Sequence, residues 1–237
     1  MKNKSLLVFL ILFALNANLA SAKKRKAYIG LNYGLGIANK FDYYKDEGLD
    51  PTKPKNSHIS SLQLGYRFNK DIRAELAFNR FHEFKYENIL KGTNVNTGAH
   101  VMNEYYTQEV SANAVFANFY FDINSSRKFI PYVNAGLGIS INKAGDFMLE
   151  VRDGIDDSGK PFEIPPNTIG KGNTKSRFAW NVGAGLSYKI NRKVTLDLIN
   201  YKYYQLGKIS AGPDVGGDYV ETKLKIHSVS AGIKIEI

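Results

Sequence analysis

Cysteine is absent from this 237-residue sequence, and there is only one tryptophan. A chain without cysteine can form neither a disulfide framework nor a thiolate metal site. A secreted chain can also lack cysteine, so this absence leaves the cellular compartment open. Beyond residue 22 the sequence also has no apolar run of the ~20 residues that a membrane-spanning helix needs, and its mean hydropathy is −0.30.

The first 22 residues have the features of a secretory signal peptide. Lys2 and Lys4 precede an apolar stretch at 6–17, and an Ala-Ser-Ala sequence at 20–22 provides a small-x-small cleavage site. A transmembrane anchor is the alternative, but the apolar stretch is much shorter than a spanning helix. We therefore expect a cleaved signal peptide at 1–22 and a mature chain of 23–237.

Eight segments of about a dozen residues alternate apolar with polar side chains, which is the period of a β-strand. The expected strands are 27–38, 58–68, 72–84, 105–122, 129–141, 178–190, 194–206 and 224–237. Short turns at 69–71, 124–126 and 191–193 alternate with long polar stretches at 39–57, 85–104, 142–176 and 207–221. The pattern predicts one all-β domain, an eight-stranded antiparallel transmembrane β-barrel with short periplasmic turns and four long extracellular loops.

Each expected strand has one apolar face and one face of small or polar residues. In the segment 178–190, for example, Phe178, Val182 and Leu186 oppose Asn181 and Gly183. A soluble lipocalin-type barrel with its apolar face inward is the alternative to a membrane barrel. The polar face carries charges that a dry ligand cavity would leave unpaired, namely Arg67, Arg73, Glu75, Asp197, Lys234 and Glu236. We therefore expect the apolar face to meet lipid.

The narrow interior of an eight-stranded barrel requires small side chains and leaves no wide channel. Since unpaired buried charges are costly, we expect the inward charges to pair with one another. The segment 105–122 fits the alternation less well, because Val110, Ala112 and Ala114 have the opposite parity to Val115 and the apolar residues after it. A β-bulge near 113–114 would reconcile the two parts.

Aromatic side chains lie near both ends of the expected strands, as in the two interfacial belts of membrane barrels. An ordinary aromatic-rich sheet is the alternative explanation. At the long-loop ends these residues are Phe81, Phe84, Tyr105, Tyr106, Phe178, Tyr203 and Tyr204. At the short-turn ends they are Tyr28, Tyr66, Phe68, Phe119, Phe121, Phe129 and Tyr188.

The sequence has no motif that predicts a cofactor, a metal site or catalysis. Gly-x-Gly pairs at 34–36, 136–138 and 183–185 lack the third glycine and the helix of a dinucleotide site. The four histidines do not have metal-ligand spacing. Alternation places His227 and Ser228 on opposite faces, so they are poorly arranged as base and nucleophile. We therefore expect a protein that is not an enzyme.

The net charge of +10 would ordinarily favour nucleic acid or another anionic partner. The stretch 39–57 is balanced, however, and 207–221 is acidic. The basic excess lies instead at the expected periplasmic rim: 23–26, Lys70, Arg73, Arg127, Lys128, Lys189, Arg192 and Lys193. Anionic lipid headgroups account for this placement, and nucleic acid does not.

Three segments resemble the opacity-protein-like outer-membrane β-barrel family: 129–138 (FIPYVNAGLG), 182–188 (VGAGLSY) and 227–233 (HSVSAGI). The lysine- and tyrosine-rich texture is similar to that of the adhesins proposed for rickettsial surfaces. The resemblance covers the whole mature chain. It implies an outer-membrane protein, expected as a monomer among lipid, that binds host-cell or extracellular-matrix proteins. A structural or porin-like barrel without a dedicated partner is the alternative.

If the protein is an adhesin, aromatic side chains of the loops are the expected contacts. Exposed rings supply contact area at low entropic cost and are enriched among interface hot spots. They could equally pack the loops together or lie at the lipid boundary. The candidate adhesive residues are Phe41, Tyr43 and Tyr44 in the first long loop and Phe147, Met148 and Phe162 in the third.

Overall fold

The computed structural model describes residues 27–40, 54–93, 100–123, 127–156, 158–213 and 219–237. The expected signal peptide and most of the first long loop lie outside these residues. The described strands are β1 (Ala27–Ala38), β2 (Ser57–Arg67), β3 (Ile72–Thr93), β4 (His100–Asp122), β5 (Phe129–Ala144), β6 (Phe147–Ile155), β7 (Pro161–Gly170), β8 (Asn173–Lys189), β9 (Val194–Pro213) and β10 (Tyr219–Glu236). The described residues contain no helix that is long and apolar enough to span a membrane.

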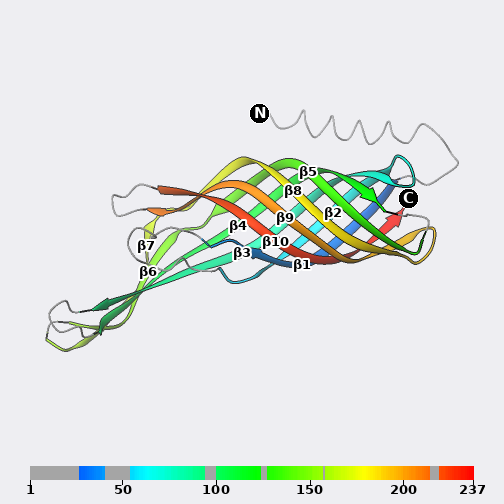
Figure 1. The fold of residues 1–237 in the computed structure, drawn as a ribbon. Coiled ribbons are helices and arrows are strands. Elements are labelled where there is room, and N and C mark those ends of the chain that lie inside the picture. Colours follow the sequence, from blue (N-terminus) through cyan, green and yellow to red (C-terminus); the bar gives the residue numbers. More distant parts are fainter. Residues whose placement is uncertain (1–26, 41–53, 94–99, 124–126, 157, 214–218) are drawn as a thin grey trace.

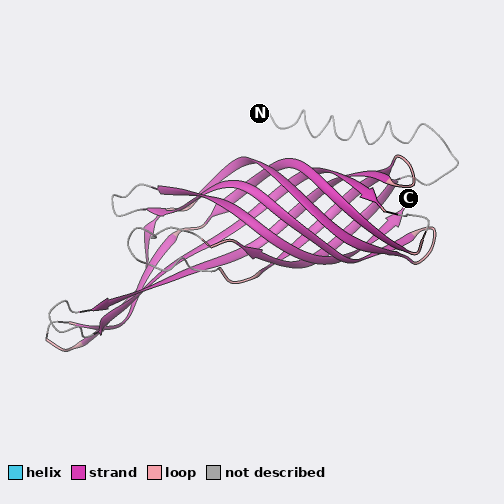
Figure 2. Ribbon diagram, viewed as in Figure 1, coloured by secondary structure: helices cyan, strands magenta, loops and turns pink. Residues whose placement is uncertain are grey.

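Eight of these strands form a closed antiparallel ring, seen from the side in Figures 1 and 2. The strand order is β3-β2-β1-β10-β9-β8-β5-β4, and β3 also pairs with β4. The first and last strands join in continuous register from Tyr28↔Glu236 to Ala38↔Ile226. Closure leaves no edge strand in the ring, which is what a β-structure in lipid requires. The expected eight-stranded antiparallel barrel is confirmed.

Two of the four expected long loops are largely strand, so the loop prediction was wrong for 85–104 and 142–176. β3 and β4 remain paired as far as Thr93↔His100, and the third stretch folds into the β6–β7 hairpin. Lipid does not require one apolar face in these segments, so their residues lack the clear alternation of the ring strands. The expected fourth loop is also shorter, because β9 continues to Pro213 and β10 begins at Tyr219.

The outward face of the ring is apolar, as expected. Leu31, Leu137 and Phe178 are 56%, 62% and 63% exposed, although each is surrounded by ordered strand. Small residues opposite them make room in the lumen. A Cβ atom on Gly65 would overlap the Tyr28 ring, so this position accepts no larger side chain without rearrangement.

The bulge expected near 113–114 is not there. β4 keeps one register against β5 from Val110 to Asp122, and Val110, Ala112 and Ala114 are buried inside the barrel. The irregularity lies in the neighbouring strand, between Phe81 and Phe84 of β3. Apolar residues occur at inward positions of β4 because this half of the lumen is itself apolar.

At the short-turn end the lumen contains a charged network around Arg73, which is 1% exposed. Arg73 pairs with Glu75, and its Nε lies 3.0 Å from Asp122 Oδ1. Its guanidinium also lies 3.8 Å from the centre of the Tyr120 ring. The hydroxyl of Tyr28 donates to Glu75 at 2.6 Å. Arg73 is therefore part of the interior and not of the basic rim where the sequence placed it.

The other inward charges named from the sequence are paired as well. Arg67 contacts Asp122 at 3.0 Å and Glu236 at 2.9 Å. Lys234 Nζ lies 2.7 Å from Asp197 Oδ1. All six charges named from the sequence thus have a partner of opposite sign, and the pairing prediction is confirmed. The alternation did not single out Asp122, which links the two arginines.

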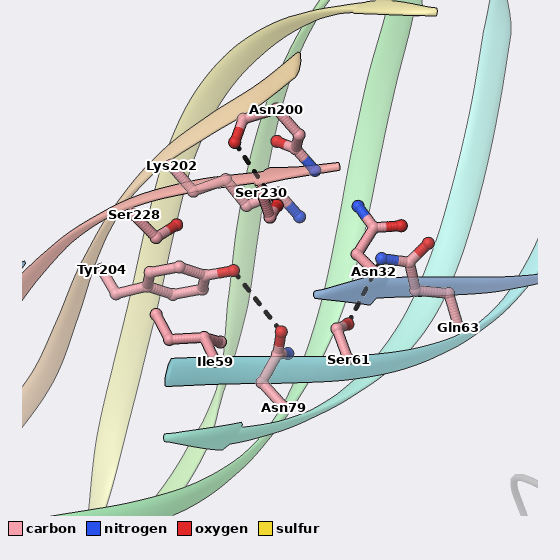
Figure 3. A pocket seen from close by; sticks show the side chains of 10 residues that line it. All are labelled: Asn32, Ile59, Ser61, Gln63, Asn79, Asn200, Lys202, Tyr204, Ser228 and Ser230. Atoms are coloured by element: carbon pink, nitrogen blue, oxygen red, sulfur yellow. Dashed lines mark hydrogen bonds between the residues drawn. The ribbon is translucent and has the colours of Figure 1, made fainter. Parts of the chain in front are cut away.

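The middle of the lumen is polar and nearly filled. Side chains of β1, β2, β3, β9 and β10 line a cavity of about 10 Å³, and Figure 3 shows them from close by. Tyr204 donates to Asn79 at 3.4 Å, and Gln63 donates to Ser61 at 3.2 Å. A cavity of this size holds about one water molecule.

Apolar side chains fill the long-loop half of the lumen. They include Ile59, Phe81, Phe84, Val110, Phe116, Tyr204, Leu206, Leu224 and Ile226. The prediction of interfacial belts was therefore wrong for Phe81, Phe84 and Tyr204, and also for Tyr28 at the other end. Phe68, Phe119, Phe121, Phe129 and Phe178 do point outward, as expected.

Because the lumen is filled in three layers, the purified monomer is expected to give no large, stable conductance in planar bilayers. Eight-stranded barrels are just wide enough for their own side chains. Recordings from protein and from detergent alone should agree within noise. Reproducible long-lived conductance steps from the folded monomer would show that the packed lumen opens.

Candidate functional site

The most prominent feature outside the ring is a four-stranded sheet that extends from its long-loop end. It consists of residues 85–93 of β3, residues 100–109 of β4, and all of β6 and β7, and is called the projecting sheet below. In Figure 1 it extends past the rest of the barrel at the lower left. β4 pairs with β3 on one side and with β6 on the other, and β6 pairs with β7. Nine residues of β3 beyond Phe84 give the sheet a length of ~30 Å.

β7 forms one edge of the projecting sheet, and its sequence limits pairing with other strands. It contains Pro161, Pro165 and Pro166, which lack the N–H that a further strand would need. The hairpin turn before it is closed by Asp156, whose side chain accepts from the backbone N–H of Lys160 at 2.9 Å. Gly159 supplies the left-handed conformation in this turn, with φ of 79°.

One face of the projecting sheet is open to water. Ile89, Tyr105 and Glu150 are neighbours across β3, β4 and β6 on this face, and Ile89 is 48% exposed. The Arg152 guanidinium lies 4.4 Å from the centre of the Tyr105 ring and donates two hydrogen bonds to Glu150. These hydrogen bonds lower the pKa of the Glu150 carboxyl. The exposed face thus combines an apolar side chain with an ordered aromatic–cation pair.

The opposite face of the projecting sheet is packed. Phe147 is buried and stacks on Tyr106, with ring centres 5.8 Å apart and planes 23° apart. Tyr86 and Val151 are buried as well. Phe147 therefore holds β6 against β4.

The six candidate adhesive residues do not lie together on one surface of the part of the chain that the structure describes. Met148 is half-buried on the exposed face, and Phe162 lies on β7 with 36% of its surface exposed. Phe147 lies on the packed face, whereas Phe41, Tyr43 and Tyr44 lie outside the described residues. A binding role for any of them stays a prediction.

Several exposed apolar residues of the projecting sheet were missed by sequence reasoning. They are Ile89, Ile155, Ile164 and Ile169. All lie in stretches that were expected to be loops. β4 begins at His100, five residues before the expected strand 105–122, and the β-favouring Val101 was the available signal in this stretch.

The projecting sheet is acidic, although the chain as a whole is basic. Residues 85–109 and 147–170 carry four basic and eight acidic side chains, a net charge of −4. At the neighbouring barrel rim, Glu221 contacts Lys175, Arg177 and Lys208 at 3.0–3.3 Å. Hydrogen bonds from Lys208 and Lys175 lower the pKa of the Glu221 carboxyl. The basic excess thus lies mainly elsewhere, including the exposed Arg127, Lys128 and Lys189 at the short-turn end.

His227 and Ser228 lie on opposite faces of β10, as the alternation predicts. His227 Nδ1 contacts the Tyr201 hydroxyl at 2.7 Å, while Ser228 is buried in the lumen. A serine–histidine contact that the sequence did not indicate joins Ser60 Oγ and His82 Nε2 at 3.3 Å. Among the described residues no carboxylate contacts His82, so this pair lacks the third member of a catalytic triad.

The chain is similar to outer-membrane proteins in sequence and in fold. The family model for the outer membrane protein beta-barrel domain matches residues 5–235. The chain is 24% identical to outer membrane protein PagN of Salmonella typhimurium over 161 residues, which cover 68% of this chain and 62% of PagN. It is 25% identical over 250 residues to an uncharacterized protein of Brucella abortus, covering 88% of this chain and 82% of that one.

Among solved structures, Neisserial surface protein A matches with a TM-score of 0.54 and 15% sequence identity, over 89% of this chain and 97% of that one. At this identity the likeness concerns the fold, and it agrees with the closed ring of eight strands. Because the family model matches nearly the whole chain, we conclude that the protein belongs to the outer membrane protein beta-barrel domain family and resides in the outer membrane.

Proposed function

We propose that the protein is an adhesin whose projecting sheet binds host-cell or extracellular-matrix proteins outside the bacterium. In outer-membrane barrels the short turns face the periplasm and the long connections face outward. With this orientation the projecting sheet, ~30 Å long, extends from the ring into water.

The observation that carries the proposal is that apolar side chains are exposed on this sheet: Ile89 on its open face, and Phe162 and Ile164 on the edge strand β7, where Ile164 pairs with Val151 of the packed face. Ile89, Ile164 and Phe162 are 48%, 43% and 36% exposed. Apolar side chains that are exposed on the outside of the ring contact lipid, but lipid does not reach the projecting sheet. Exposed apolar groups rimmed by charges mark protein interaction sites. We retain Phe41, Tyr43 and Tyr44 as candidate contacts from the neighbouring loop, together with Met148.

The charge of the projecting sheet favours a protein partner over a polyanion. A sheet with net charge −4 repels nucleic acids and sulfated polysaccharides, whereas apolar contacts with a charged rim resemble a protein–protein interface. The filled lumen, in turn, gives a porin-like function little structural support.

Replacing Ile89, Phe162 and Ile164 together with serine is expected to weaken binding to cultured host cells by about tenfold or more, because buried apolar anchors dominate interface energy. Flow cytometry with the purified, folded and labelled protein measures the binding. The matched control replaces Phe68 and Ile190, which are similarly exposed but lie at the short-turn end. The barrel's heat-modifiable mobility on gels should be the same in all variants.

Pretreatment of the host cells identifies the class of partner. Binding should be lost after surface proteolysis and should survive both heparinase and a rise in NaCl from about 0.15 M to about 0.5 M, since salt screens mainly surface charges. Parent-like binding by the triple variant would contradict the role of the sheet. Loss of binding after heparinase would contradict a protein partner.

A further inference from the structure

Arg80 is a charged residue on the outer wall of the ring. It lies on β3 on the same face as Phe78, which is 47% exposed. Its Nη1 donates to Asn113 Oδ1 at 3.1 Å, and no carboxylate among the described residues forms an ion pair with it. In the lumen, by contrast, Arg67 and Arg73 both pair with acids. The lipid-facing cation therefore needs an anion from outside the protein.

The height of Arg80 in the barrel indicates where that anion lies. Arg80 follows Ile72, the first residue of β3, by eight residues, which at ~3.3 Å per residue and a tilt of ~40° is about 20 Å along the membrane normal. The apolar band of such barrels is ~25 Å tall, and a lipid-facing arginine costs ~2–4 kcal/mol at the midplane but only ~0–1 near an interface. Arg80 thus lies near the headgroups on the long-loop side.

Other polar groups surround Arg80 on the same wall. Ser60 is directly opposite Arg80 across β2 and β3, and its hydroxyl contacts His82 Nε2 at 3.3 Å. His58, two residues before Ser60, stacks on Tyr33 with ring centres 5.5 Å apart. Guanidinium, imidazole and hydroxyl groups are all suited to hydrogen-bond a phosphate.

An apolar groove of about 610 Å³ adjoins this polar cluster. Its walls include the outward side chains of Leu31, Leu62 and Phe78. It is hollow because Tyr33 has a small neighbour on each adjacent strand, Ser60 on β2 and Ala231 on β10. Ser60 borders both the groove and the polar cluster, so one molecule can occupy both.

We propose that this wall binds a phosphorylated acyl lipid of the outer leaflet. The phosphate lies at Arg80 and His82, and an acyl chain lies in the groove below Ser60. Arginine recognises phosphate through paired hydrogen bonds, and lipid is the molecule that surrounds this wall. The assignment to the outer leaflet rests on the orientation given under Proposed function, whereas the site itself does not.

Native mass spectrometry of the purified barrel in detergent tests the proposal. It measures binding of lipid A, a glucosamine-based bisphosphate. Arg80→Gln is expected to weaken lipid A binding by about tenfold, because hydrogen bonds to charged groups are strong. Ala231→Phe, which fills the groove and leaves the cation in place, should also weaken it. Arg127→Gln removes an exposed charge at the opposite rim and should have no effect. Heat-modifiable mobility on gels confirms that each variant is folded.

The lipid comparison separates the sources of the phosphate. Dephosphorylated lipid A should bind the parent protein about as weakly as lipid A binds the Arg80→Gln variant. Inorganic phosphate alone should not displace bound lipid A. Parent-like binding by Arg80→Gln, or equal binding of the dephosphorylated lipid, would overturn the site. Equal affinity for phosphatidylglycerol would overturn the assignment to an outer-leaflet glycolipid. None of these measurements involves host cells, so their outcome is independent of the proposed adhesion.

Discussion

Replacing Arg73 with methionine is expected to destabilise the folded barrel by about 3–5 kcal/mol, the cost of breaking a buried ion pair by removing one partner. Arg73 is 1% exposed and is the cation that pairs with Glu75. Asp122 retains Arg67, so the loss falls mainly on Glu75. Urea titration of the barrel in lipid vesicles, followed by heat-modifiable mobility on gels, measures the free energy of unfolding.

Two further variants separate the loss of pairing from a general effect of substitution. Lys70→Met makes the same change on a side chain that is 76% exposed, and it should alter stability by less than about 0.5 kcal/mol. Adding Glu75→Gln to Arg73→Met should recover part of the loss, because the buried carboxylate is then gone. A single Arg73→Met variant as stable as the parent would show that the network contributes little.

Deleting residues 146–171 is expected to abolish most host-cell binding while leaving the ring intact. Ala144 and Asn173 are directly paired at the ends of β5 and β8, so the deletion joins Gly145 to Gly172 as a two-residue hairpin loop. Gly-Gly suits the tight turns that connect antiparallel strands. The variant loses β6 and β7, and with them Met148, Phe162 and Ile164. Flow cytometry on host cells measures the binding.

The deletion also tests whether the sheet or the remaining loops carry adhesion. The shortened barrel should keep its heat-modifiable mobility, because all eight ring strands remain. Full binding by a folded deletion variant would assign adhesion to other loops, including the one that contains Phe41, Tyr43 and Tyr44. Loss of mobility together with binding would show that the hairpin is needed for the ring itself.

The ring could be predicted from the sequence because lipid imposes a simple rule on its strands. In β5, for example, Val133, Leu137 and Ile139 must face hydrocarbon, and their alternation with small residues is visible in one dimension. The rule weakens in β4, where Ala112 and Ala114 point into an apolar part of the lumen. Apolar residues then occur on both faces of the strand. Their alternation alone does not show which face contacts lipid and which points into the lumen.

The projecting sheet could not be predicted in the same way, because water covers one of its faces and its pairing is between distant segments. Phe147 illustrates the difficulty for the site. Its sequence neighbours fit an exposed loop, but its stacking partner Tyr106 lies 41 residues earlier, on β4. Whether such an aromatic side chain binds a partner or packs inside the sheet depends on tertiary pairing that the local sequence does not encode. The exposed Ile89 was missed for the same reason.

The central claim is that the projecting sheet stands outside the cell, and site-specific proteolysis on intact bacteria tests it most directly. One variant carries a protease recognition sequence in the β6–β7 turn at 158–159, and a matched variant carries it in the short turn at 191–193. We predict that protease added to intact cells cuts only the first variant and that both are cut after permeabilisation. Cleavage of intact cells at 191–193 but not at 158–159 would contradict the orientation and the adhesive role built on it.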